Sequence, residues 1–461
     1  MTAEKDPSTD EEVANDLTSP ATKHPVKWYR STFYNALILG LCNFLAPGIW
    51  GAMNSLGGGG ASKPYLVNTA NALTFCLMVL SCFFGSVVVK FIGVKWTLIV
   101  GAMGYAPYAA GIYTQVRYDS DWLTIFGAAL CGLSAGVFWM AESAIALAYP
   151  EPWNQGRFLG FWLSFRVLGQ IVGGAINLGV NIDRDSAGSV SYVVYYVFIT
   201  LQGLGVFTGL LLTSPAKVQR ADGVPVKLRI ANDVWFEIKA MVKLLLSREF
   251  LLIVPLIWQA TFSEAVMFTY NSLWFSVRAR ALGSFLSGIM AIICGNLLGA
   301  FLDSKVSLKL RSRVGFAVVL GLQGAWWLWG TVVVTEYNRT QPAYDWVDSG
   351  FGRGFAVYLF WVVGFQLNYM YFVVGNLAKN EEEVARIAGL LRGMESASQA
   401  VSYGLSSVSI MASVGSIYLN FGLWAIALFP AWLVIKEIGL SLGDKKVERE
   451  TRTAREVNTA P

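Results

Sequence analysis

The sequence has few charged residues for its length. Asp, Glu, Lys and Arg make up 14% of its 461 residues, whereas a soluble domain carries about a quarter. The one histidine, His24, excludes a multi-histidine metal site, and no Ser–His–Asp set, Cys–His set or nucleotide-binding motif can be assembled. The net charge of +5 comes from basic residues in short connections, so it does not indicate nucleic-acid binding. We therefore expect no enzyme, no cofactor and no metal site.

The sequence also lacks a disulfide framework and a cleavable signal. All five cysteines fall inside apolar stretches and have no metal-ligand spacing, so we interpret them as small hydrophobic residues. The first 30 residues are polar and contain no basic segment followed by an apolar core, so we expect no cleaved signal peptide. The first apolar stretch would then direct membrane insertion. The cysteines are Cys42, Cys76, Cys82, Cys131 and Cys294.

Hydrophobic residues, in contrast, make up 55% of the chain. A membrane-spanning helix needs about 20 mainly apolar residues, since hydrocarbon cannot satisfy an open backbone group. Twelve stretches meet this requirement, in two sets of six, and predict an all-α membrane protein with twelve transmembrane helices in two six-helix pseudo-repeats. They cover roughly 32–53, 65–89, 96–115, 122–148, 158–180, 191–213, 250–275, 283–302, 314–334, 354–377, 386–411 and 416–435.

The domain organisation follows from these stretches. We expect a disordered cytoplasmic arm (1–31), an N-terminal half (32–213), a basic cytoplasmic linker (214–249), a C-terminal half (250–435) and a cytoplasmic tail (436–461). The linker is either an amphipathic helix against the inner membrane surface or a simple segment whose basic face is attracted to anionic lipid. The helical spacing rests on Val234, Trp235, Ile238, Met241, Val242 and Leu245.

Lys and Arg in the connections predict the orientation, because cytoplasmic loops are enriched in them. With a cytoplasmic amino terminus, only seven of the 35 lie outside and two, Arg166 and Arg392, lie within spans. Both termini are therefore predicted to be cytoplasmic, in a plasma membrane or an endomembrane. The sequon at Asn338 then falls in an outside connection and predicts a glycoprotein. The seven are Lys63, Arg117, Arg184, Arg278, Arg280, Arg339 and Arg353.

The two halves carry an internal repeat. An offset of 229 residues aligns Arg157 with Arg386, Gln170 with Gln399, and Asn177 with Ser406. The same offset places Arg166 opposite Glu395 and Gly160 opposite Gly389. Two parallel six-helix repeats are the architecture of the major facilitator transporters.

That superfamily places a Gly-x-x-x-Asp-Arg-x-Gly-Arg motif in an inner loop, where the resemblance implies contacts that hold the halves together. After the second span this chain has only part of the motif, and after the eighth span it keeps the acid. The residues are Lys90, Gly93 and Lys95 in the first loop and Gly299, Asp303 and Lys305 in the second.

Three segments resemble the Unc-93-like (ion channel regulatory protein) branch of this superfamily. They are Cys42-Asn-Phe-Leu-Ala-Pro-Gly-Ile-Trp50, Phe138-Trp139 with Ser143, and Asn154 to Trp162. The resemblance is strongest over about 30–215. It implies a twelve-helix facilitator fold, with function ranging from channel regulation and receptor escort to transport.

Ionisable residues within spans indicate where function lies, because each costs roughly 2.5–3.5 kcal/mol at mid-membrane. Glu142 and Arg166 lie about 12 Å from the inner ends of adjacent spans and form either a fixed ion pair or a substrate or proton site. Glu395 reaches the same depth and Glu264 lies deeper. Neither has an obvious basic partner, so both are expected to exchange protons. Arg392 is expected to extend to the membrane surface as a structural residue.

Polar residues continue these positions at helical spacing and predict a water-accessible cavity between the halves. Pro47-Gly48 predicts a kink in the first span, and Gly57 to Gly60 a flexible outside turn. The candidates for a substrate or ion pathway are Glu142, Arg166, Gln170, Asn177, Glu264, Gln366, Glu395 and Gln399.

The sequence thus predicts a secondary transporter that moves a small molecule by alternating access, with protons as the candidate coupling ion. The alternative is a non-transporting regulator or chaperone of another membrane protein. The predicted partners of this protein are the lipid bilayer and either a small-molecule substrate, for a transporter, or a membrane protein, for a regulator.

Overall fold

A computed structural model describes residues 25–151, 155–221, 223, 225–226, 234–379 and 381–443. Most of the predicted arm, residues 1–24, and most of the predicted tail, residues 444–461, lie outside the described residues. Within the described residues the chain folds into helices, with only isolated β-bridges between extended segments. The all-α prediction is therefore confirmed.

The helices of the N-terminal half follow the predicted spans closely. The first span is interrupted by a π-helical turn, Phe44–Gly48, and the third is divided at residues 103–104. The helices are α2 (Thr32–Asn43), α3 (Ile49–Ser55), α4 (Tyr65–Ile92), α5 (Val94–Ala102), α6 (Tyr105–Tyr118), α7 (Trp122–Ala148), α8 (Gln155–Asn181) and α9 (Tyr192–Leu210).

The C-terminal half begins after a helix in the linker. The tenth span is divided into two helices, and the last begins with a π-helical turn, Met411–Gly415. The helices are α10 (Val234–Leu245), α11 (Arg248–Trp274), α12 (Val277–Leu302), α13 (Leu308–Thr340), α14 (Phe351–Trp361), α15 (Phe365–Gly375), α16 (Glu381–Ser406) and α17 (Ser416–Ile435).

Among the described residues, ten segments are long and apolar enough to cross a membrane. The other two predicted spans correspond to α5 with α6, which are short, and to α16, which carries charged residues. The chain is thus a multi-pass membrane protein, and these two elements lie where the remaining spans were predicted.

The predicted kink in the first span has a clear local cause. Pro47 lacks the N–H that an α-helix needs, and the chain forms a π-helical turn around it. A Cβ atom on Gly48 would lie 3.1 Å from the Cα of Gly169, and one on Gly169 only 2.6 Å from the carbonyl oxygen of Phe44. The two glycines therefore let the first span and α8 approach backbone to backbone.

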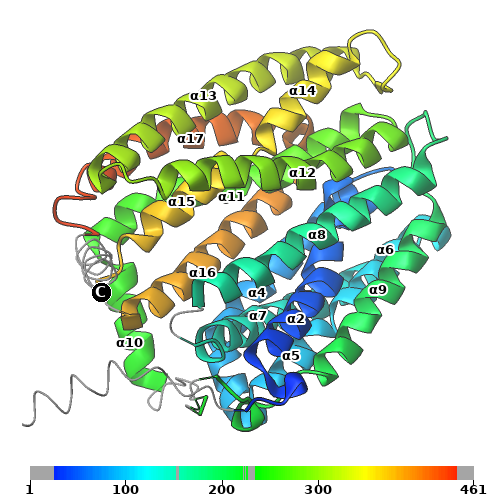
Figure 1. Cartoon of the computed structure of the whole chain (residues 1–461). Helices are drawn as coiled ribbons and strands as arrows, with labels where there is room; N and C mark the ends of the chain where they lie inside the picture. The colour runs from blue at the N-terminus through cyan, green and yellow to red at the C-terminus, as the bar shows by residue number, and fades with distance from the viewer. Residues whose placement is uncertain are drawn as a thin grey trace, which may run out of the picture.

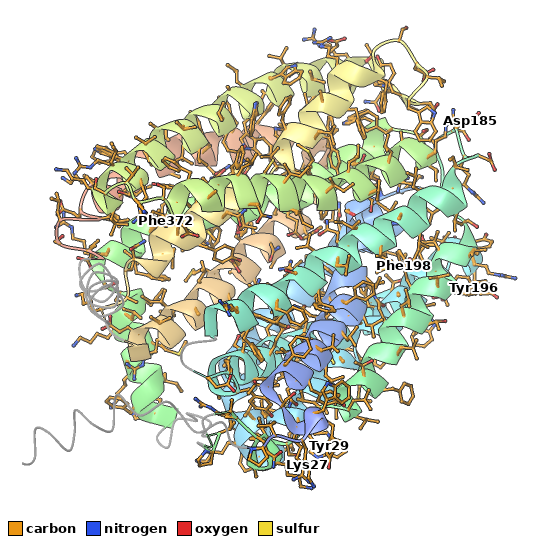
Figure 2. The ribbon with its side chains drawn as sticks, viewed as in Figure 1. Lys27, Tyr29, Asp185, Tyr196, Phe198 and Phe372 are labelled. Atoms are coloured by element: carbon orange, nitrogen blue, oxygen red, sulfur yellow. The ribbon has the colours of Figure 1, made fainter. Side chains whose placement is uncertain are left out.

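The halves meet along two helix pairs, α8 with α12 and α4 with α16. Figure 1 shows α8 and α12 side by side between the two sets of helices. We call the end that carries the 182–191 connection the outer end, following the predicted orientation. Figure 2 shows Asp185 at this end and Lys27 and Tyr29 at the opposite, inner end.

The linker contains a true helix, α10, rather than only an irregular connection. Met241, Leu244 and Leu245 pack against the core of the C-terminal half, while Trp235 and Val242 are exposed. One side of α10 thus contacts protein, and the exposed side carries apolar residues together with Lys239 and Lys243, a composition typical of an interfacial helix. Its contact with the membrane stays a prediction.

Candidate functional site

The halves are joined at the outer end by a buried arginine. Arg280, on the first turn of α12, is only 1% exposed. Its Nε donates to the carbonyl oxygen of Leu56 at 2.9 Å, and its two terminal nitrogens donate to three more backbone oxygens. These three oxygens belong to Gly57 (2.9 Å), Ala61 (3.1 Å) and Gly188 (2.9 Å). Arg280 therefore fastens the C-terminal half to two connections of the N-terminal half.

The glycine turn that receives Arg280 is packed, which corrects the prediction of a flexible turn. Gly57, Gly58, Gly59 and Gly60 all have positive φ values, from 52° to 85°, and all are buried. Only glycine adopts this succession of left-handed conformations without strain. The turn directs carbonyl oxygens inward, towards the guanidinium group.

Serine and asparagine side chains extend this outer contact along α8 and α12. The Oγ atoms of Ser55 and Ser284 are 2.6 Å apart, and Gln170 Nε2 donates to Ser287 Oγ at 3.1 Å. Asn177 Nδ2 donates to Ser284 Oγ at 3.4 Å. Two of the candidate pathway residues, Gln170 and Asn177, thus lie between the halves, and their role in a pathway stays a prediction.

The second helix pair makes the corresponding contact. Asn68, on α4, donates through Nδ2 to Thr269 Oγ1 at 3.0 Å and to the carbonyl oxygen of Ser406 at 2.9 Å. Ser406 aligns with Asn177 in the predicted repeat, and both positions carry a hydrogen bond between the halves. One position of the repeat thus contributes to the contact between the halves in both helix pairs.

The inner ends of the two halves are not joined in the same way as the outer ends. In the part of the chain that the structure describes, every direct hydrogen bond between the two halves involves residues near the outer end. Burial along α12 is dense up to Gly288 and sparse beyond it. The helices α8 and α12 therefore contact each other mainly over their outer parts.

The inner-loop motif does not join the halves in this conformation. Lys95 donates to the carbonyl oxygen of Leu210 at 2.7 Å, within its own half. The other polar members of the motif, Lys90, Asp303 and Lys305, are exposed. The remaining members, Gly93 and Gly299, lie at the end of α4 and within α12.

Below the outer contact, ionisable side chains from both halves gather around Trp139 on α7. Arg166 lies one turn inward of Gln170 on the same face of α8, with its guanidinium carbon 5.3 Å from the centre of the Trp139 ring. Arg392, from α16, approaches the same ring to 4.3 Å. Trp139 is thus contacted by an arginine from each half, at cation–π distances.

The predicted Glu142–Arg166 ion pair is not formed. Glu142 is fully buried and accepts a hydrogen bond from the indole N–H of Trp162, while its other oxygen has no hydrogen-bond partner among the described residues. Arg166 is exposed and, within the described part of the chain, has no hydrogen bond or ion pair.

Glu395 has the basic partner that the sequence analysis did not expect. Its Oε2 lies 3.0 Å from a terminal nitrogen of Arg392, one turn earlier on α16. Arg392 is therefore not only a structural residue at the membrane surface. The spacing of three residues, typical of helical ion pairs, was the signal that could have revealed this contact.

Glu264 is held by neutral groups instead. Gln399 Nε2 donates to one carboxylate oxygen at 2.8 Å, and the Tyr403 hydroxyl donates to the other at 3.2 Å. The Tyr403 ring stacks on Phe75 of the N-terminal half, with ring centres 5.6 Å apart. Glu264 and Gln399 therefore form a hydrogen bond next to the other half, a contact that the sequence analysis did not predict.

Gln366 lies elsewhere. It is buried within the C-terminal half and donates a hydrogen bond to Gln259 of α11. Tyr369, one turn later, donates to the carbonyl oxygen of Ser312. This face of α15 therefore packs inside its own half. The polar spacing identified the face correctly, but it could not identify which helix the face contacts. The structure thus gathers six of the candidates near the boundary between the halves, whereas Glu142 is buried against Trp162 in the N-terminal half. The six are Arg166, Gln170, Asn177, Glu264, Glu395 and Gln399.

The fold is that of the major facilitator transporters. A POT family transporter in complex with 5-aminolevulinic acid superposes with a TM-score of 0.62 at 12% identity, covering 88% of this chain and 96% of that one. A D-xylose–proton symporter superposes with a TM-score of 0.58 at 14% identity, covering 88% and 97%. At these identities the likeness concerns the fold alone.

Other proteins share a higher sequence identity with this chain than these solved structures do. The Notoamide biosynthesis cluster protein O' of Aspergillus versicolor is 40% identical over 91% of this chain and 92% of its own length. An UNC93-like protein of Schizosaccharomyces pombe is 28% identical over 86% and 80%, and UNC93-like protein 1 of Arabidopsis thaliana is 27% identical over 82% and 84%. The family model described as ion channel regulatory protein UNC-93 matches residues 64–322. This chain therefore belongs to the UNC-93 family.

Proposed function

We propose that this protein is a secondary transporter that moves a small organic molecule by alternating access to a site between its halves. The observation that carries the proposal is the charged cluster around Trp139, to which both halves contribute. This cluster lies inward of Gly288, beyond the part of α12 that packs closely against α8. In a transporter of this fold, such a position is reached from one side of the membrane at a time.

Arg166 is the group that we assign to substrate binding. It is an exposed cation beside an aromatic ring, and in the described part of the chain no carboxylate lies within ion-pair distance. An intramembrane charge of this kind is functional by default. The name of the Aspergillus relative refers to a biosynthesis cluster, which favours a product of small-molecule biosynthesis as the substrate class.

Glu264 and Glu395 are the residues that we assign to proton coupling. Glu264 accepts hydrogen bonds from an amide and a phenol, groups that remain in place whether or not the carboxyl group carries a proton. Glu395 pairs with Arg392, which also contacts Trp139. Protonation of Glu395 would weaken the pair and change the charge next to that ring.

The test is metabolite profiling inside and outside cells that lack the protein, with rescue by the wild type, Glu264→Gln or Glu395→Gln. The matched control is Glu336→Gln, which removes an exposed carboxylate in an ion pair at the outer end. We expect a compound whose distribution is restored by the wild type and the control but not by the other two variants at equal abundance. Restoration by all variants would refute the proton role. A metabolite profile that is the same in cells with and without the protein would refute transport.

The family description favours a second candidate, a regulator of another membrane protein. A regulator would not need the charged cluster. It should tolerate Glu264→Gln and Glu395→Gln and fail when a surface is altered, such as the exposed face of α10 with Trp235 and Val242. Co-purification of a membrane protein, retained by the two glutamate variants and lost by a Val242→Glu variant, would support this alternative.

A further inference from the structure

The groups that hold Arg280 form an unusual site, which we call the carbonyl cage. It consists of the backbone oxygens of Leu56, Gly57, Ala61 and Gly188. In the described structure, Arg280 contacts this cage and no carboxylate within ion-pair distance. A buried guanidinium group is thus balanced by neutral dipoles, and the site recognises it by charge and by N–H donors together.

All four oxygens of the cage belong to the N-terminal half, whereas Arg280 belongs to the C-terminal half. If the halves separate at the outer end, the cage remains with one half and its occupant leaves with the other. The serine and asparagine contacts differ from the cage because they involve no charged group.

The cage is held in place without Arg280. Val190 N donates to Gly60 O at 2.9 Å, which joins its two connections, and the Tyr195 hydroxyl donates to Gly59 O at 3.0 Å. The turn itself is closed by Ala61 N donating to Gly58 O at 2.9 Å. These bonds lie within the N-terminal half and do not involve Arg280, so we expect them to hold the oxygens when Arg280 withdraws. The 182–191 connection is bonded to α12 as well, through Val277 N to Ser186 O at 3.0 Å and Arg278 N to Arg184 O at 2.9 Å.

Its chemistry selects one class of ligand. The distances of 2.9–3.1 Å are those of N–H donors to carbonyl oxygens, spread over a planar, three-nitrogen group. Four neutral carbonyl groups compensate a single positive charge, whereas sites for divalent ions use carboxylates. A free guanidinium-type or primary ammonium cation therefore suits the cage.

We propose that the carbonyl cage is a binding site for a free cation of this class, which replaces Arg280 when the outer ends separate. Such a cation outside the membrane then competes with Arg280 and favours the separated state. This inference goes beyond the proposed function, since binding at the cage does not require that the protein transports anything.

The experiment is chemical rescue of the full-length Arg280→Ala variant in detergent, with free guanidinium as the probe. We expect a lower melting temperature for the variant, and saturable recovery of at least half of the loss in low-millimolar guanidinium chloride. Tetramethylammonium chloride, whose cation has no N–H donor, and sodium chloride should not restore it. Arg353→Ala, which removes an exposed arginine at the same end, measures the general effect of the salt. Equal effects of all three salts, or no recovery, would overturn the proposal.

A second measurement uses protein that retains Arg280, in case the alanine variant does not fold. A Ser284→Cys variant places a thiol at the buried outer contact, where an impermeant thiol reagent reaches it only after the outer ends separate. Guanidinium at ten times its dissociation constant should raise the labelling rate about tenfold by mass action. An unchanged rate would overturn the proposal, and a flux assay that fails beside a positive result would refute only the proposed transport function.

Discussion

Gly174 offers the sharpest test of the contact between α8 and α12. A Cβ atom at this position would lie 2.6 Å from Phe285 Cα and 2.9 Å from Phe285 N, on the facing helix. These are backbone atoms, so no side-chain rotation can relieve the overlap. Gly174→Ala must therefore push the helices apart at the outer contact.

The magnitude follows from the overlap. Ordinary contacts of a Cβ atom begin near 3.4 Å, so the facing backbones must move by most of an ångström. Overpacking of this kind costs about 1–3 kcal/mol. Because the cost falls only on the state in which the helices touch, the equilibrium should shift towards the separated state by roughly 5- to 150-fold.

The assay is labelling of Ser284→Cys by an impermeant thiol reagent added from outside. Gly174→Ala should accelerate labelling, whereas Gly179→Ala, on the same helix with no atom within 4 Å of its added Cβ, should not. A well-expressed Gly174→Ala variant that labels no faster than Gly179→Ala would refute the reasoning. Acceleration by both would show that the effect does not come from the contact with Phe285.

Three further predictions each concern one residue. Arg278 lowers the pKa of Asp345 to about 2, whereas the pKa in the unfolded chain is about 3.9. The ionised carboxylate therefore stabilises the fold above about pH 3.9, and this stabilisation is lost as pH falls from about 4 to 2. Asp345→Asn should make the melting temperature depend less on pH over this range, and the same dependence in variant and wild type would contradict the prediction. Asn338→Gln should abolish the mobility shift caused by a glycosidase, and a shift that persists would refute glycosylation at this sequon. Trp162→Phe should lower the free energy of unfolding by about 1–3 kcal/mol because Glu142 loses its donor, and an unchanged chemical-denaturation midpoint would show that the hydrogen bond is not stabilising.

Hydropathy was sufficient to predict where the helices lie, though not where they end. The span predicted at 314–334 lies within α13, Leu308–Thr340, which continues six residues beyond it at each end. Apolar composition detects only the part that contacts lipid or the core, whereas the backbone hydrogen bonds of a helix continue into polar sequence. The same reason explains why α16, with several charged residues, falls below the hydropathy of the other spans.

The site was predictable in part. Glu264 with Gln399, and Gln170 with Asn177, lie close to the boundary between the halves, because polar side chains within apolar spans have few other places to lie. Arg280 was counted among the residues of outside connections. No sequence pattern indicates that four backbone oxygens will surround it, because carbonyl groups are present at every residue and only the tertiary fold gathers them.

The composition of the outer contact bears on the choice between a transporter and a fixed scaffold. Its direct hydrogen bonds come from serine, threonine, asparagine, glutamine and tyrosine side chains, two arginines and backbone groups. When such groups separate into water, each exchanges a protein partner for a solvent partner, at a net cost of about 0.5–1.5 kcal/mol per bond. An interface closed by large apolar side chains would instead expose hydrocarbon to water, at about 25 cal/mol per Å². The outer contact also buries apolar side chains, including Ala265, Val277 and Ala281 of the C-terminal half packed with the N-terminal half. The many polar groups at this end nevertheless lower the cost of separation, and together with a charged cluster that both halves share they favour reversible opening over a permanent scaffold.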